Sequence, residues 1–93
     1  MIHVKAIIRL YINGRQSPFS NGYRPLFSFM NSMKTSGQII LPEHKLFYPG
    51  NEEEVEIKFL SKDYLGNDFK VGSTFTFGEG PNTLGDGKIL RIM

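Results

Sequence analysis

The side chains best suited to acid–base catalysis and metal binding are few and scattered in this sequence. Its two histidines, His3 and His44, lie far apart along the chain, and neither is accompanied by a pattern of carboxylates. A catalytic triad or a zinc site needs several such groups that converge on one point. We therefore expect both histidines to be ordinary surface residues, and we predict no metal site.

Carboxylates gather at one place in the sequence, at Glu52, Glu53, Glu54 and Glu56. Carboxylate oxygens are the ligands that hard cations prefer. Consecutive residues of a strand, however, point to opposite faces of a sheet, so these side chains would diverge. We interpret the run as the solvated beginning of a strand.

Two glycine-rich segments, 78–81 and 85–87, lack the Lys-Ser or Lys-Thr ending of a phosphate-binding loop, and we interpret them as turns. The chain has no cysteine, which excludes disulfides and thiolate chemistry. We therefore predict that the protein is not an enzyme and that it uses no cofactor.

The elements that must position any binding residues are short segments of alternating polarity, bounded by glycine, proline or asparagine. Strands are predicted over 3–12, 23–30, 38–41, 53–60, 73–78 and 88–92. Such short strands without a helical period indicate an all-β barrel or sandwich. The first strand should bury Val4, Ala6, Ile8, Leu10 and Ile12 on one face. The predicted core includes Val4, Ile8, Phe27, Phe29, Ile39, Val55, Ile57, Phe75 and Phe77.

Five short pieces, 14–19, 22–25, 36–42, 48–50 and 78–80 with 83–85, follow one another in a recognisable order. Through them almost the whole chain resembles the third, C-terminal β-barrel domain of translation elongation factor Tu. The resemblance implies that residues 1–93 form a single domain, a closed six-stranded antiparallel β-barrel.

In that family the barrel holds the T-stem side of aminoacyl-tRNA and packs against a GTPase domain. The GTPase motifs belong to that other domain, so the resemblance implies no nucleotide binding here. The RNA-binding candidates that it implies are Arg15, Thr35, Lys62, Glu79 and Gly80. Arginine can fork onto a phosphate, threonine can donate to one, and glycine lets two backbones approach.

The sequence departs from the family at several of its RNA contacts. Leu26 stands where the family has glutamine, residues 30–33 replace an Arg-Thr-Thr-Asp run, and Asn82 replaces a basic residue. The segment Tyr23-Arg24-Pro25 is better explained as a structural corner, because an aromatic beside an arginine at the start of a strand commonly anchors a barrel.

Composition sets the remaining expectations. The net charge of +2 lacks the basic excess of a general nucleic-acid binder. No apolar run approaches the ~18–20 residues of a membrane span, so we expect a cytoplasmic protein with no membrane partner.

Three hypotheses for the function follow. The first is a non-catalytic module that binds a protein or RNA partner of the translation machinery, with a protein expected as the main partner and tRNA bound only weakly. The second is a decoy, antagonist or immunity-type protein that exploits a translation-factor-like surface. The third is a remnant without an independent role.

Overall fold

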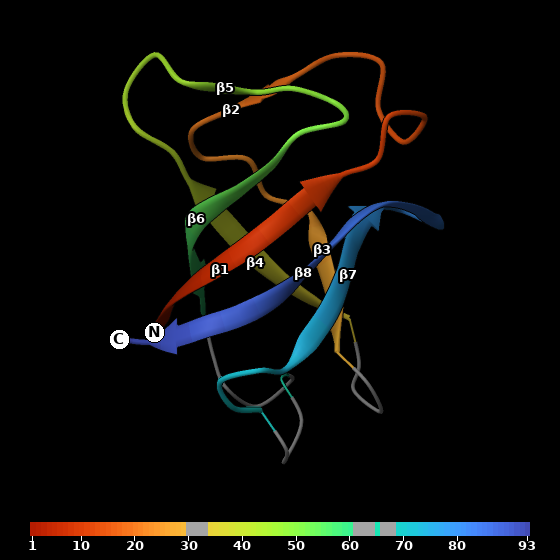
Figure 1. Ribbon diagram of the computed structural model, residues 1–93. Helices are drawn as coiled ribbons and strands as arrows, with labels where there is room; N and C mark the ends of the chain where they lie inside the picture. Colours follow the sequence, from red (N-terminus) through yellow and green to blue (C-terminus); the bar gives the residue numbers. More distant parts are fainter. Residues whose placement is uncertain (30–33, 61–64, 66–68) are drawn as a thin grey trace.

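The computed structural model describes residues 1–29, 34–60, 65 and 69–93 and contains strands but no helix in this part of the chain (Figure 1). The strands are β1 (Ile2–Leu10), β2 (Phe19–Ser20), β3 (Leu26–Phe29), β4 (Thr35–Ile40), β5 (Leu46–Phe47), β6 (Glu52–Phe59), β7 (Thr74–Glu79) and β8 (Asn82–Ile92).

Six of these strands form a closed barrel in the order β1-β6-β4-β3-β7-β8, in which β8 pairs again with β1. All pairings around the barrel are antiparallel. The two short strands β2 and β5 pair separately and lie across the end of the barrel opposite the two termini (Figure 1). The predicted fold, a closed six-stranded antiparallel β-barrel, is confirmed.

The barrel closes around the apolar faces that the alternating pattern predicted. All nine residues of the predicted core are buried. Phe27 is fully buried, and its ring makes edge contacts with the rings of Phe59 and Phe75 at centroid distances of 5.1 and 5.6 Å. One face of each strand is therefore fixed by the core, and the other face is left for solvent or a partner.

The prediction for Ile12 was wrong, because β1 ends at Leu10 and the side chain of Ile12 is 73% exposed. The reason lies in the backbone, where the amide of Gly14 donates to the carbonyl oxygen of Tyr11 at 3.1 Å. This turn begins one residue before Ile12 and takes it out of the alternation.

The interpretation of 85–87 as a turn was also wrong. A turn at Gly80 and Pro81 connects β7 directly to β8, which runs through both later glycines to Ile92. A Cβ atom on Gly85 would lie 2.5 Å from the ring of Phe77 on the paired strand. Glycine is present at this position because the phenylalanine ring occupies the space of a side chain.

Several strand boundaries also differ from the predicted ones. The third strand of the structure begins at Leu26 and not at Tyr23, which forms only an isolated bridge with Ile39. Pro25, which is buried, has no amide to donate to a ladder. In the described part of the chain, no helix has the length and apolarity required to cross a membrane.

Candidate functional site

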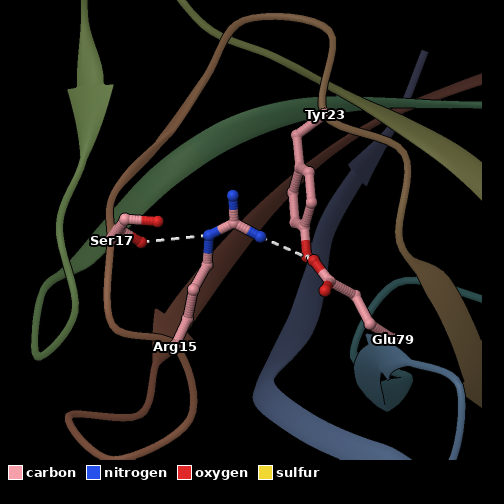
Figure 2. Close-up of polar contacts among 4 residues, drawn as sticks. All are labelled: Arg15, Ser17, Tyr23 and Glu79. Carbon is pink, nitrogen blue, oxygen red and sulfur yellow. Dashed lines mark hydrogen bonds and ion pairs between the residues drawn. The ribbon is translucent and has the colours of Figure 1, made fainter.

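Arg15 and Glu79 form an ion pair that joins the connection between β1 and β2 to the end of β7. The Nη1 atom of Arg15 lies 2.6 Å from Oε2 of Glu79, and its Nε donates to the carbonyl oxygen of Ser17 at 3.0 Å. Figure 2 shows the guanidinium held between these two acceptors. The side chain of Arg15 is therefore fixed in position before any ligand binds.

Tyr23 completes this cluster from the other side. Its hydroxyl donates to the same carboxylate oxygen of Glu79 (Figure 2). The guanidinium carbon of Arg15 lies 4.8 Å from the centre of the Tyr23 ring, which is within the range of a cation–π contact. We call these three residues the Arg15 cluster.

A stack of aromatic rings connects the Arg15 cluster to the buried core. The ring of Tyr23 stacks on Phe19 at a centroid distance of 4.5 Å, and Phe19 stacks on Phe47 at 5.0 Å. Phe19 and Phe47 belong to the paired strands β2 and β5. The arginine therefore lies at one end of a column of rings that is anchored in the buried core.

Burial and the neighbouring carboxylate change the acid–base behaviour of Tyr23. Partial burial of the phenol is the largest cause that raises the pKa of Tyr23, and the hydrogen bond to Glu79 is the next. Tyr23 is therefore a protonated donor at neutral pH. The cluster consists of one cation, one anion and one neutral donor, and its charges balance internally.

The structure brings three of the residues that were predicted to bind RNA together, namely Arg15, Glu79 and Gly80. Gly80 adjoins Glu79 in the turn after β7, where its carbonyl oxygen accepts from the Lys34 ammonium at 3.2 Å. Thr35 faces the interior of the barrel and is only 7% exposed, so it does not fit the predicted role of a surface donor. Lys62 lies outside the described residues.

The predicted corner 23–25 is held by backbone contacts with β4. The amide of Gly22 donates to the carbonyl oxygen of Ile39 at 2.9 Å. The amide of Ile39 donates in turn to the carbonyl oxygen of Tyr23 at 2.8 Å. Gly22 has a φ of 92°, which glycine adopts without steric cost. Arg24 is exposed and lines a separate small pocket with Gln38 and Lys58.

A second cluster with the same three kinds of side chain lies between β1 and β8. Oδ2 of Asp86 accepts from Nη2 of Arg9 at 2.9 Å and from the hydroxyl of Tyr11 at 2.7 Å. The hydrogen bond to Asp86 is the largest cause that raises the pKa of Arg9 and also of Tyr11. We call this group the Arg9 cluster, and it was not apparent from the sequence because Asp86 lies 77 and 75 residues away from Arg9 and Tyr11 along the chain.

The histidines occupy unrelated places. Nδ1 of His3 lies 3.3 Å from the carboxylate of Glu56 on the neighbouring strand, whereas His44 is exposed on the connection between β4 and β5. Among the described residues, no three histidine, aspartate or glutamate side chains are grouped so that they could hold a metal ion.

A comparison with known protein families found no family model that matches the chain.

Proposed function

We propose that the protein is a non-catalytic binding module related to the third domain of elongation factor Tu, and that its main partner is a protein of the translation machinery. The relationship to that domain rests on the five sequence pieces and agrees with the closed six-stranded barrel. The choice of a protein over RNA rests on the state of Arg15.

The observation that carries this choice is the ion pair between Arg15 and Glu79. Of the candidate residues that the structure describes, Arg15 is the only cation, and its charge is already neutralised by a carboxylate 2.6 Å away. A phosphate at this position would have to displace Glu79 or lie beside its negative charge. Either event reduces the gain from the contact.

The surroundings of the Arg15 cluster add little positive charge. One further cation is tied to the turn beside Glu79 by a contact, namely Lys34, whose ammonium donates to the carbonyl oxygen of Gly80. A protein that neutralises about two phosphates binds RNA weakly at physiological salt, since each contact contributes through counterion release. A protein surface, by contrast, can pair with both the acidic and the basic groups of this face.

The proposal is tested by titration of labelled aminoacyl-tRNA at ~150 mM salt with the wild type and Arg15→Ala. We expect feeble binding that Arg15→Ala changes little. Sub-micromolar binding that Arg15→Ala weakens by about 1 kcal/mol or more would reject the protein partner in favour of a tRNA site.

A further inference from the structure

The outer face of the barrel carries a row of polar side chains that crosses five neighbouring strands. Arg9 of β1 lies opposite Glu52 of β6 on one side and Asp86 of β8 on the other. Asp86 lies opposite Thr76 of β7, which in turn lies opposite Ser28 of β3. Residues that lie directly opposite one another point to the same side of a sheet, so these five side chains share the outer face.

A second row runs beside the first and has a different character. Ile7 of β1 lies opposite Lys88 of β8, and Lys88 lies opposite Thr74 of β7. Leu90 is exposed two residues beyond Lys88 on the same strand. A cation therefore lies between two apolar side chains and a hydroxyl group.

The two rows line a groove of about 670 Å³ over β1, β8 and β7, which lie side by side in Figure 1. The short side chains of Ser28, Thr74 and Thr76 keep this part of the outer face recessed, while Arg9 and Leu90 also line it. A volume of this size is in the range of about 300–1,000 Å³ that is typical of ligand sites.

The two cations in the groove, Arg9 and Lys88, differ in whether they have a partner within the protein. Arg9 is paired with Asp86, and Asp86 also accepts from Tyr11. The side chain of Lys88, in contrast, makes no hydrogen bond or ion pair with any other residue that the structure describes. The groove thus offers one unpaired cation next to an apolar surface formed by Ile7 and Leu90.

We propose that this groove binds an extended segment of a partner protein, with a carboxylate on Lys88 and an apolar side chain against Ile7 and Leu90. The inference rests on the proposed function, because it names the surface and the chemistry by which a protein partner is bound. Outward residues along β8 are spaced at about 6.8 Å, which is also the spacing of alternate side chains in an extended peptide. The expected pattern is apolar-x-acidic-x-polar, with the polar residue beside Asp86 and Thr76, which form the next outward pair after Lys88 and Thr74.

The same groove is poorly suited to RNA. The carboxylates of Glu52 and Asp86 line it, and each of them repels a phosphate. The apolar contribution of Ile7 and Leu90 also has no counterpart in a phosphate backbone. A phosphate backbone carries a charge on every nucleotide, whereas a peptide with a single carboxylate placed at Lys88 meets less of this repulsion. The groove therefore favours a partly apolar peptide with one acidic residue.

The test uses the whole protein and a capped heptapeptide, Ser-Leu-Ser-Asp-Ser-Asn-Ser, with matched peptides in which lysine replaces Asp or serine replaces Leu. Amide shifts in the NMR spectrum should change at Ile7, Thr74, Lys88 and Leu90. We expect roughly tenfold weaker binding for the lysine peptide, and a similar loss for Lys88→Glu with the original peptide. Lys88→Gln should lie between the wild type and Lys88→Glu.

Lys58→Glu is the matched control, because it makes the same change in net charge on β6, where Lys58 lies opposite Gln38 and outside the groove. It should alter the affinity for the peptide less than about twofold. Binding that ignores Lys88→Glu, shifts confined to another face, or competition by a short RNA for the Lys88 signals would overturn the groove assignment. Because the tRNA titration is independent, weak tRNA binding together with these results would reject the groove while leaving the protein partner standing.

Discussion

Phe75 lies directly opposite Gly87 across the β7–β8 pair, and its ring fills the space that a side chain on Gly87 would need. A Cβ atom on Gly87 would come within 2.5 Å of Cζ of Phe75 and 2.7 Å of the carbonyl oxygen of Ile7. Phe75 is buried and the oxygen belongs to the backbone of β1, so neither neighbour can move away easily.

Gly87→Ala is therefore expected to destabilise the protein by about 1–3 kcal/mol through overpacking. Urea unfolding followed by circular dichroism measures the change. Phe75→Leu combined with Gly87→Ala should cost less than the sum of the two single changes, since the shorter side chain relieves the clash with the ring. Strict additivity would show that the ring and the glycine are not coupled.

Phe47→Ala should destabilise by roughly 3–5 kcal/mol, because Phe47 is fully buried and forms the base of the aromatic column under Tyr23. Thermal unfolding gives the size of the loss. Leu46→Ala, on the same short strand but 40% exposed, is the matched control and should cost less than about 1 kcal/mol. Equal losses for the two variants would contradict the role of the column.

Glu79→Gln should strengthen tRNA binding at low salt by roughly three- to tenfold, because it removes the carboxylate that neutralises Arg15. The change keeps an oxygen that can accept from Tyr23. Filter binding at ~50 mM salt measures the effect. Glu43→Gln changes the net charge equally at an exposed site and should have little influence; equal gains from both would mean that only the net charge matters.

The stability of the protein should fall as the pH rises above 10. The folded protein keeps the proton on Tyr23 to a higher pH than the unfolded chain, whose tyrosine has the ordinary pKa of 10.0. The contribution is therefore constant below the unfolded pKa and is lost as the pH rises from there toward the folded one. Tyr23→Phe should lower the stability at pH 7 and flatten the decline above pH 10 relative to the wild type. Parallel curves of unfolding free energy against pH for the two proteins would refute this.

The barrel could be predicted from the sequence because its strands have one buried face. The alternation of Phe75 and Phe77 with Thr74 and Thr76 gives the strand and its orientation together. Strands β2 and β5 were missed because two residues carry no period. The first half of β8 was missed because Gly85 and Gly87 signal turns locally, and only the rings on β7 explain their presence.

The candidate site could be predicted only in part. Arg15 and Glu79 were both named, from the family resemblance, as RNA contacts. Their pairing with each other was not visible, because 64 residues separate them in the sequence. Lys88 was missed for a related reason, since a single lysine on a strand becomes notable only when its neighbours on β1 and β7 are known.

Closure of the barrel determines how any partner can be recognised. Each of the six strands is paired with a neighbour on both sides, so over the paired residues that the structure describes a partner finds no free row of backbone amides and carbonyls to which it could add a strand. A partner that binds the outer face over these paired residues is therefore recognised through side chains. Because those side chains alternate with the core residues along each strand, a single substitution can redirect the choice of partner while the packing beneath it stays intact.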